Sequence, residues 1–391
     1  MNSKNNLIKR LLPISGIRQV FEKAKKLESE GREIIHLEIG RPDWHMPPYA
    51  ITAIKMALEE GQYHYISNRG LLNLRENIVQ YIKEKVGFKY DAEKEVVVTL
   101  GASEALSMCC LALLGEGDEI IVPLPAWNHY KSTVEMVGAK AVDYNLDPEN
   151  NFQIDVEELT RQITSKTKLI IINSPANPSG AIQNEDTLKN IAKIAMEKGI
   201  FIFSDEVYDN FVYEGEHISI GQYMKDSEFF IYVNSFSKTF AMTGTRVGFI
   251  ASQQNISDAI NRIHQYLTVC GVPYSQVAAN AALSNKHCQE YLDEMRKAFK
   301  DRRNIWIDGL SDNPNIKMYD PKGAFYLFPS INYKRMCGKD FCDFILNNHS
   351  VAMVPGEVFG SAFKNHVRIS YGRDKDTQVK AVNILQEVLS K

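Results

Sequence analysis

The 391-residue sequence lacks the features of several large protein classes. It contains only six cysteines: Cys109 and Cys110 are adjacent, and Cys337 and Cys342 have no second pair that could complete a zinc site. Its nine histidines include no HExxH pair. No apolar run approaches the roughly 18 residues that cross a bilayer. We therefore expect reduced thiols, no bound metal and no membrane-spanning segment.

The sequence also lacks an excess of charge of one sign. Lys and Arg total 45 and Asp and Glu total 48, which gives a net charge of −3. Binding to nucleic-acid phosphates needs a concentrated excess of cations, so this balance argues against a nucleic-acid partner. Residues 1–13 have cations but only short apolar pairs and no small-residue cleavage site, so we expect no leader and a cytoplasmic protein.

The composition is otherwise that of an ordinary globular protein, with 44% hydrophobic and 24% charged residues. At about 150 residues per domain, the length predicts two or three domains. The sequence contains no internal repeat and no Ser/Gly-rich linker. We therefore expect domains that pack against one another.

Short apolar runs alternate with helical patterns between residues 95 and 252. Because these runs are almost continuously hydrophobic, they are typical of strands covered on both faces, namely 96–98, 120–122, 169–172, 200–203, 229–233 and 247–250. Segments 103–114 and 185–198 between them have helical patterns. This alternation predicts an α/β fold with a mostly parallel sheet and helices on both sides, in which the last strand is antiparallel.

The rest of the chain predicts a second, smaller α+β domain. A helical stretch over 275–310 is too long for a simple connection and is expected to form a spine between the domains. Strands are expected at 325–328, 351–354 and 367–370, with a final helix at 377–389. A helix over 17–30 is expected to dock on this part. The predicted division is a large domain of residues 46–280 and a small domain of residues 1–45 and 281–391.

Ligands of open parallel sheets bind at the carboxyl ends of the strands, so the loops that follow the strands are the places to search. Gly101, Ala102 and Ser103 open a helix after the first strand, and free N–H groups at such a helix start suit a phosphate. A helix cap at Ser103 would explain the same residue. After strand 229–233, one loop carries Ser235, Ser237, Lys238 and Arg246. Partial burial of Lys238 would lower its pKa and make it a nucleophilic amine.

Two further loops carry polar residues after buried strands. Asn177 lies in the loop that follows strand 169–172, and Asp205 follows strand 200–203 at its carboxyl end. A buried carboxylate is costly without a cationic partner, so Asp205 indicates a cation nearby. Taken one at a time, Asn177 is also typical of a turn and Asp205 of a helix cap.

Together and in this order, these loops resemble the class I and II aminotransferases, pyridoxal-phosphate enzymes of fold type I. The similarity runs from segment 37–43 to the region of Arg368, and segment 235–248 fits the family's cofactor-attachment pattern throughout. The resemblance implies a large cofactor-binding domain with a mostly parallel seven-stranded sheet, a smaller α+β domain, and a homodimer with shared active sites. It also implies a role in amino-acid metabolism and biosynthesis.

The resemblance implies three catalytic residues. Lys238 would hold pyridoxal 5′-phosphate as a Schiff base and, once displaced by the substrate amine, move the Cα proton. Asp205 would keep the ring nitrogen protonated so that the ring accepts electron density. Tyr208, with Asn177, would hydrogen-bond the phenolic oxygen of the cofactor.

The resemblance also assigns the groups that bind the rest of the cofactor and the substrate. Trp127 would stack on the ring, although an aromatic residue there could also belong to the core. The phosphate would be bound by the Ala102 backbone and by Ser103, Ser235, Ser237 and Arg246, with Tyr65 reaching the phosphate of the neighbouring subunit. The substrate would be bound by Gly40, Asn177 and Arg368. Arg368 would clamp the substrate α-carboxylate beside Gly40, where only glycine leaves room, unless Arg368 is a surface residue of its strand.

The predicted function is therefore transfer of the amino group of an L-α-amino acid to a 2-oxo acid in ping-pong order. A pyridoxal-phosphate lyase, an elimination or replacement enzyme, or a cyclase would share the same residues, because these reactions share one carbanion. A regulator with a DNA-binding module is disfavoured, since the similarity begins near the N-terminus and no basic patch is present.

The identities of donor and acceptor stay open. Ser103 stands where some aspartate-using members of the family have a lysine, and only Arg18 and Arg69 are candidates for binding a second carboxylate. These differences argue against a standard aspartate or glutamate donor.

Overall fold

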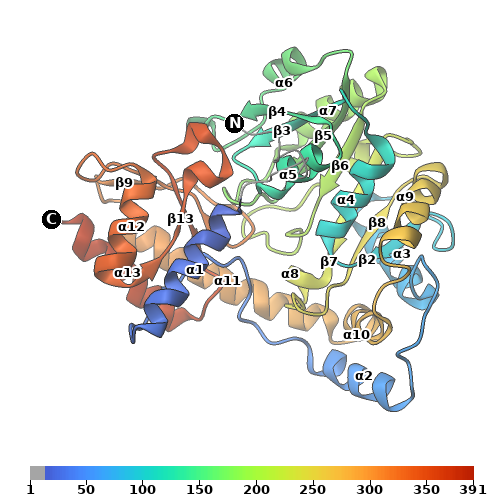
Figure 1. Ribbon diagram of the computed structural model, residues 1–391, viewed down its shortest axis with the longest axis horizontal. Coiled ribbons are helices and arrows are strands. Elements are labelled where there is room, and N and C mark those ends of the chain that lie inside the picture. The colour runs from blue at the N-terminus through green and yellow to red at the C-terminus, as the bar shows by residue number, and fades with distance from the viewer. Residues whose placement is uncertain (1–13) are drawn as a thin grey trace, which may run out of the picture.

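The computed structural model describes residues 14–391 (Figure 1). Residues 1–13, in which the sequence predicts no leader, lie outside this range. None of the helices formed by residues 14–391 is both long enough and apolar enough to cross a bilayer.

A seven-stranded sheet forms the centre of the fold (Figure 1). Its strands lie in the order β2-β8-β7-β6-β5-β3-β4, and β8 runs antiparallel to both of its neighbours while the other pairs are parallel. The strands are β2 (Val96–Thr99), β3 (Glu119–Leu124), β4 (Lys140–Asn145), β5 (Thr167–Asn173), β6 (Phe201–Asp205), β7 (Phe230–Ser235) and β8 (Gly248–Ala251). The α/β class, the mostly parallel sheet and the antiparallel last strand are thus confirmed.

Burial, and not position in the sheet, decides which strands the hydrophobic pattern detects, since β2 lies at one edge and is fully buried. In β5, Ile170, Ile171 and Ile172 are at most 2% exposed, because helices cover both faces of the sheet. Strand β4 lies at the edge and carries the exposed Lys140 and Asn145. It has no continuous apolar run, and the pattern of apolar residues did not predict it.

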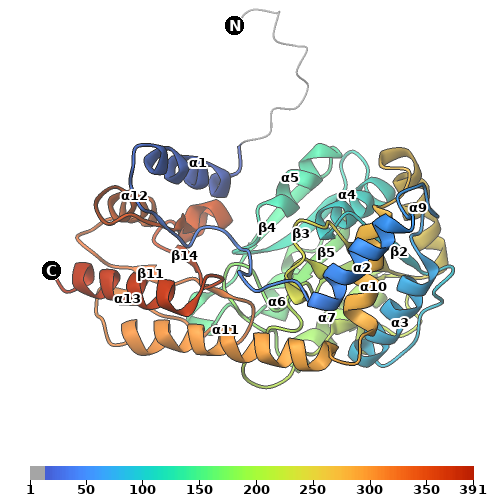
Figure 2. The same ribbon diagram turned by 90° about the horizontal axis from the view of Figure 1, so that it is seen from below.

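Helices cover both faces of the sheet (Figure 2). On one side lie α4 (Ala102–Leu113), α5 (His129–Met136) and α9 (Gln254–Leu267), and on the other α3 (Leu72–Val86), α6 (Val156–Gln162) and α7 (Glu185–Lys198). Local signals set the ends of these helices. In α7, for example, the Asn184 side chain accepts a hydrogen bond from Thr187 N at 2.8 Å, and Gly199 ends the helix with a φ of 66°.

The predicted single helix over 275–310 is wrong. The chain instead forms α10 (Pro273–Ser284), which packs on α2 (Pro48–Glu59), and α11 (Cys288–Leu310). Between them the Asn285 side chain accepts a hydrogen bond from His287 N at 2.9 Å, a local bond that competes with the helical pattern. Helix α11 still spans the molecule from the sheet to the C-terminal part, as both ribbon views show (Figures 1 and 2).

The C-terminal part is α+β, as predicted, and the strand expected at 367–370 is confirmed, but the strand expected at 325–328 is only two residues long. One antiparallel sheet is formed by β10 (Tyr326–Leu327), β14 (Val367–Ser370) and β13 (Val354–Pro355). Two further sheets have two strands each: β1 (Ile35–His36) pairs with β12 (Val351–Ala352), and β9 (Ile316–Lys317) pairs with β11 (Ser330–Ile331). The expected strand 351–354 is therefore divided between two sheets. Helices α12 (Gly338–His349) and α13 (Lys375–Leu389) complete this part.

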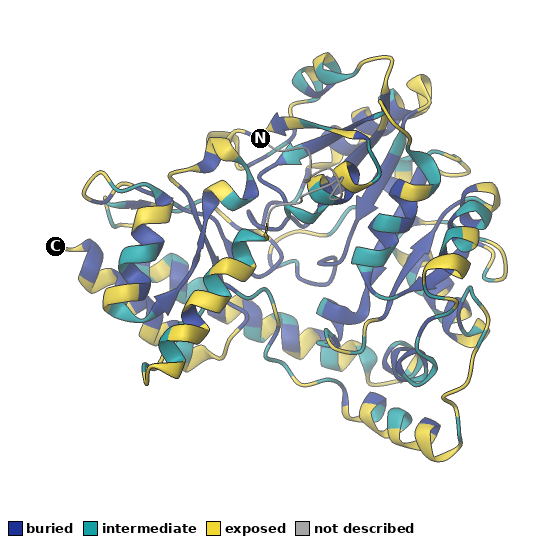
Figure 3. Cartoon of the chain, viewed as in Figure 1, coloured by how far each residue is buried: buried dark blue, intermediate teal, exposed yellow. Residues whose placement is uncertain are grey.

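Helix α1 (Gly16–Ser29) docks on the C-terminal part, as the sequence predicts. Val20, Ala24 and Leu27 of α1 pack against Leu346 and Ala352. The opposite face of the helix is exposed, and buried residues concentrate in the central sheet (Figure 3). The N-terminal segment thus belongs structurally with the end of the chain.

Candidate active site

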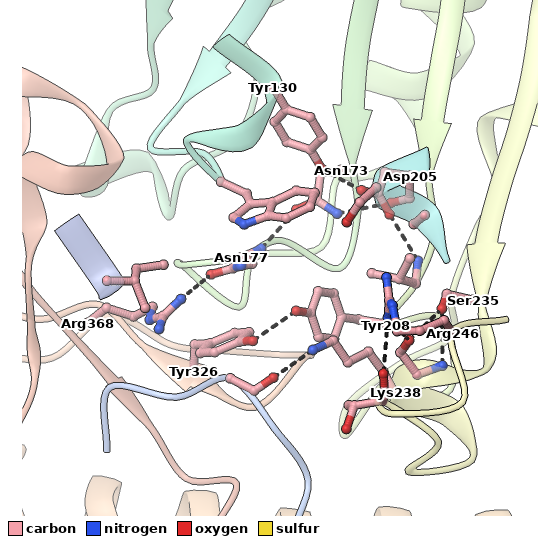
Figure 4. Close-up of a pocket in the computed structure, with 18 residues that line it drawn as sticks. Tyr130, Asn173, Asn177, Asp205, Tyr208, Ser235, Lys238, Arg246, Tyr326 and Arg368 are labelled. Carbon is pink, nitrogen blue, oxygen red and sulfur yellow. Dashed lines mark hydrogen bonds between the residues drawn. The ribbon is translucent and has the colours of Figure 1, made fainter. Parts of the chain in front are cut away.

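The carboxyl ends of three neighbouring parallel strands open into one cavity of about 230 Å³ (Figure 4). Asn173, Asp205 and Ser235 are the last residues of β5, β6 and β7, and all three line it. Gly40 and residues of the C-terminal part form the opposite wall. The other lining residues are Ile17, Ala102, Ser103, Trp127, Tyr130, Asn177, Val207, Tyr208, Ser237, Lys238, Thr243, Arg246, Tyr326 and Arg368.

Lys238 presents its amine to this cavity from α8 (Phe236–Thr239), the short helix that follows β7. Its Nζ donates a hydrogen bond to the Gly40 carbonyl oxygen at 2.6 Å. Burial, together with the positive charges of Arg368 and Arg246, lowers the pKa of Lys238 to about 8. With such a pKa about a tenth of the amine is neutral at pH 7, so Lys238 is a competent nucleophile and base.

Asp205 is a buried carboxylate that faces the same cavity. It is 3% exposed and accepts hydrogen bonds from the Tyr130 hydroxyl at 2.5 Å and from Val207 N at 3.3 Å. Burial raises the pKa of Asp205 to about 6, and the hydrogen bond from Tyr130 is the largest influence in the other direction. The carboxylate is therefore mostly ionised at neutral pH and can stabilise a cation in the cavity.

Tyr208 and Tyr326 meet across the junction between the sheet and the C-terminal part. Their hydroxyl oxygens are 2.8 Å apart and share a hydrogen bond, and burial raises the pKa of both phenols. The Tyr326 hydroxyl lies so close to Gly40 that a Cβ there would be 2.1 Å from it. Any side chain at position 40 would displace Tyr326, which agrees with the prediction that this position needs glycine.

Arg368 is fully enclosed in the opposite wall, on β14. Its guanidinium lies between the rings of Tyr326 and Phe359, 4.8 and 4.9 Å from their centroids. It donates to Asn177 Oδ1 at 3.1 Å and to the Glu38 carbonyl oxygen, while its Nε has no hydrogen-bond partner among residues 14–391. A buried cation without a full set of partners favours an anionic ligand. The alternative of a surface arginine is wrong, since Arg368 is 1% exposed.

A second anion-binding arrangement lies at the start of α4. No side chain of residues 14–391 caps this twelve-residue helix, so these residues leave its first N–H groups free to bind an anion. Arg246 extends beside them, with Nη2 donating to the Leu100 carbonyl oxygen at 2.9 Å and Nη1 lying 3.5 Å from Ser237 Oγ. A Cβ on Gly101 would be 2.5 Å from Arg246 Nη2, so only glycine at that position leaves the guanidinium in place.

We call this arrangement the cradle; it comprises the start of α4 with Ser103, together with Ser235, Ser237 and Arg246. The hydroxyl groups of Ser235 and Ser237 are held by the turn that begins α8. Ser235 Oγ accepts from Ser237 N at 3.1 Å and donates to Ser237 Oγ at 2.9 Å or to the Val247 carbonyl oxygen. Ser103 lies in the first turn of α4, where Gly101 is the N-cap, so the alternative of Ser103 as a cap is wrong. A phosphate would thus meet a helix terminus, hydroxyl groups and a guanidinium.

The structure brings together all but one of the residues predicted for the site. Tyr65 is the exception: its side chain is 86% exposed and does not line the cavity of its own chain. Its predicted contribution to a neighbouring subunit stays a prediction. Neither candidate for a second carboxylate lines the cavity, and Arg69 is paired with Ser257 and Asp258 instead.

Sequence reasoning missed Tyr130, Asn173 and Tyr326, as well as Ile17, Val207 and Thr243. Asn173 could have been found, because it ends a strand at the same edge as Asp205. Tyr130 lies three residues after Trp127 in the sequence, at the start of α5 (His129–Met136). No local signal marks Tyr326, which reaches the cavity from a distant strand.

Comparisons with known proteins agree with this geometry. A family model described as aminotransferase class I and II matches residues 32–385. The chain is 38% identical to an aspartate aminotransferase of Pyrococcus horikoshii. The 380 aligned residues cover 97% of this chain and 95% of that protein. It is 36% identical to aromatic-amino-acid aminotransferase 2 of Thermococcus litoralis, over 96% and 95% of the two chains. A solved structure of aspartate aminotransferase from Thermus thermophilus with maleate matches with a TM-score of 0.93 and 31% identity, covering 99% of this chain and 100% of that one.

Proposed function

This chain belongs to the aminotransferase class I and II family, and we propose that its cavity transfers the amino group of an L-α-amino acid to a 2-oxo acid by a ping-pong mechanism. The observation that carries the proposal is the convergence of Lys238, Asp205 and Arg368 on one cavity. None of the relatives described above is named as a lyase or a cyclase, so amino-group transfer is the function proposed.

The residues of the cavity fit pyridoxal 5′-phosphate. When bound, this cofactor supplies an aldehyde that amines attack and a conjugated ring that accepts electron density from the substrate. Lys238 offers the amine, and Asp205 offers a carboxylate to a cationic ring nitrogen. Tyr208 and Asn177 would donate hydrogen bonds to the phenolic oxygen, and Trp127 would stack on the ring.

The cradle at the start of α4 would bind the cofactor phosphate. Backbone N–H groups from Ala102 onward, the hydroxyls of Ser103, Ser235 and Ser237, and the Arg246 guanidinium all border this part of the cavity. The left-handed backbone of Gly101, with a φ of 83°, and the close approach of Arg246 leave room for no side chain there. A phosphate is therefore a better fit to the cradle than a neutral group.

Lys238 would also move protons. With a pKa of about 8, a free Nζ could accept the Cα proton of a bound substrate and return it near neutral pH. The Gly40 carbonyl oxygen, 2.6 Å from Nζ, holds the amine at the wall where Arg368 would hold the substrate carboxylate. Arg368 thereby orients the Cα–H bond relative to Lys238.

We propose a donor with an uncharged side chain. Among the described residues that line the cavity, the cations are Lys238, Arg246 and Arg368, and each already has a role. A carboxylate at the far end of a substrate would find no further cation there from this chain. Ile17 and Trp127 instead offer apolar surface. The relative from Thermococcus litoralis is named for aromatic amino acids and the one from Pyrococcus horikoshii for aspartate, so this choice depends on the cavity and not on the names.

The functional unit we propose is a homodimer in the cytoplasm, with residues 46–280 as the cofactor domain and residues 1–45 and 281–391 as the small domain. The exposed Tyr65 is free to reach a neighbouring subunit, and Tyr63 and Leu72, which lie near it in the sequence, are also exposed. All six cysteines lie in the described chain and are free thiols, which suits a reducing compartment.

Amino-acid half-reactions test this function. Purified protein loaded with pyridoxal phosphate is mixed with one L-amino acid at a time, without a 2-oxo acid. We expect one equivalent of 2-oxo acid per site and then arrest, with turnover resuming when a second 2-oxo acid is added. The Lys238→Ala variant serves as the control without activity. Continuous release of ammonia from the wild-type protein would contradict transfer and favour elimination.

A further inference from the structure

Tyr130 is a buried residue of the cavity that has no role in the mechanism proposed above. It is the second residue of α5, it is 1% exposed, and its side chain contacts two groups that face the cofactor site (Figure 4). One is Asp205 and the other is Trp127.

The first contact fixes the Asp205 carboxylate. The Tyr130 hydroxyl donates to Oδ2 at 2.5 Å, and the remaining donor to this carboxylate, Val207 N, is 3.3 Å from Oδ1. Asn173 lies nearby, but its amide donates to the Asp205 carbonyl oxygen and not to the carboxylate. Of the two hydrogen bonds that the carboxylate accepts from residues 14–391, the one from Tyr130 is therefore the shorter. Oδ1 accepts only the longer bond from Val207 N within this range.

The second contact fixes Trp127. The Tyr130 ring meets the indole edge to face, with centroids 5.6 Å apart and planes at 84°. His129 stacks on the indole with centroids 4.5 Å apart and planes at 17°. Two successive residues at the start of α5 thus set the orientation of Trp127.

We propose, on the basis of the function proposed above, that Tyr130 is a positioning residue, whose hydroxyl holds the Asp205 carboxylate and whose ring holds Trp127 where each faces the cofactor. The inference follows from one rigid side chain that contacts both groups. A side chain that only filled space would not need a hydroxyl directed at the carboxylate. Phenylalanine would fill nearly the same volume.

The hydrogen bond has a consequence that can be measured. Burial raises the pKa of Asp205 to about 6, and the Tyr130 hydrogen bond opposes that shift. Of the charged groups that face the carboxylate, Glu206 raises its pKa and Lys238 lowers it. Removing the hydroxyl leaves these charges in place. Asp205 would then be protonated at a higher pH and would lose its attraction for a cationic ring nitrogen.

The test is a titration of Tyr130→Phe in the cofactor-free protein. The carboxylic-acid C=O band of Asp205 is followed by infrared difference spectroscopy and assigned by its absence in Asp205→Asn. We expect the midpoint, close to pH 6 in the wild-type protein, to rise by about one to two pH units, because a hydrogen bond to a charged group is lost. An unchanged midpoint in a folded variant overturns the proposal.

Tyr144→Phe is the matched control. Tyr144 is also a buried tyrosine, and its hydroxyl donates to the Asp155 backbone carbonyl oxygen in a region that does not line the cavity. It should leave both the Asp205 midpoint and the dissociation constant of pyridoxal phosphate unchanged. In Tyr130→Phe that constant should increase about tenfold at pH 7. When Asp205→Asn is already present, adding Tyr130→Phe should change the dissociation constant of pyridoxal phosphate by less than about twofold, because the hydroxyl acts through the carboxylate.

A second measurement needs no substitution of Tyr130, in case Tyr130→Phe does not fold. Protonation of Asp205 in the wild-type protein should shift the C–O band of one tyrosine with the same midpoint, because its acceptor loses its charge. Ring-deuterated tyrosine identifies that band. A carboxyl titration without a matching tyrosine shift overturns the proposal. Because these spectra are recorded without cofactor, they stand even if amino-group transfer fails.

Discussion

Replacement of Arg368 by lysine should impair use of amino acids far more than it impairs cofactor binding. Lysine keeps the positive charge but cannot donate in the planar fork with which Arg368 holds Asn177 and Glu38 and lies between two aromatic rings. Disrupting a buried hydrogen-bonded ion pair costs roughly 2–5 kcal/mol. Since the charge is retained, we take the lower part of this range, which corresponds to an approximately 30- to 300-fold fall in kcat/KM.

The assay follows the absorbance of bound cofactor in single turnovers at increasing amino-acid concentration. The loss should appear mainly as weaker amino-acid binding, while the dissociation constant of pyridoxal phosphate changes by less than about twofold, because Arg368 does not border the phosphate cradle. Arg302→Lys is the matched control. Arg302 is likewise buried, stacked on Phe299 and paired with Asp43, but it does not line the cavity. Unchanged amino-acid affinity in Arg368→Lys would refute the carboxylate clamp.

Three further predictions concern other parts of the molecule. Arg246→Gln should weaken the binding of pyridoxal phosphate about tenfold or more and leave the binding of pyridoxal, which has no phosphate, unaffected. Equal losses of affinity for both in equilibrium dialysis would contradict phosphate binding by the cradle. Burial lowers the pKa of His366 from 6.5 to about 4, so the unfolded state binds more protons in this range. The wild-type protein should lose about 3 kcal/mol of unfolding free energy from this group as the pH falls from 6.5 to 4. His366→Phe keeps a ring against Tyr319 and Phe328 and should not show this loss. If urea titrations give the two proteins the same dependence of unfolding free energy on pH, this prediction is wrong. Tyr65→Ala should lower activity and Lys238→Ala should abolish it. If Tyr65 serves the neighbouring site, mixing the two should raise activity per Lys238-containing subunit above that of Tyr65→Ala alone, and no rise in confirmed mixed dimers would exclude this role.

The central sheet could be predicted from the sequence because its strands are buried on both faces. Strands such as β5 consist almost entirely of branched apolar residues, and few structures besides a doubly covered strand produce that pattern. The edge strand β4 carries polar residues that face solvent, so a search for apolar runs does not find it. The break between α10 and α11 depends on a local side-chain bond at Asn285, which a periodicity of apolar residues does not register.

The candidate site could be predicted to the extent that its residues follow strands of one sheet. Asp205 ends β6, and Asn177 and Lys238 follow the ends of β5 and β7, which parallel topology must bring to one edge of the sheet, and all three line the cavity. Tyr326 reaches the same cavity from a part of the chain whose packing no local pattern encodes. Tyr65 points outward, and whether it completes a site depends on a second chain.

The proposed function depends most directly on the Lys238 amine being the group that bonds to the cofactor aldehyde. Borohydride reduction of the protein loaded with pyridoxal phosphate, followed by peptide mass spectrometry, measures where that bond forms. We predict a single reduced adduct, on Lys238, and none in Lys238→Ala. A stoichiometric adduct on another lysine, or no adduct at saturating cofactor, would contradict the assignment.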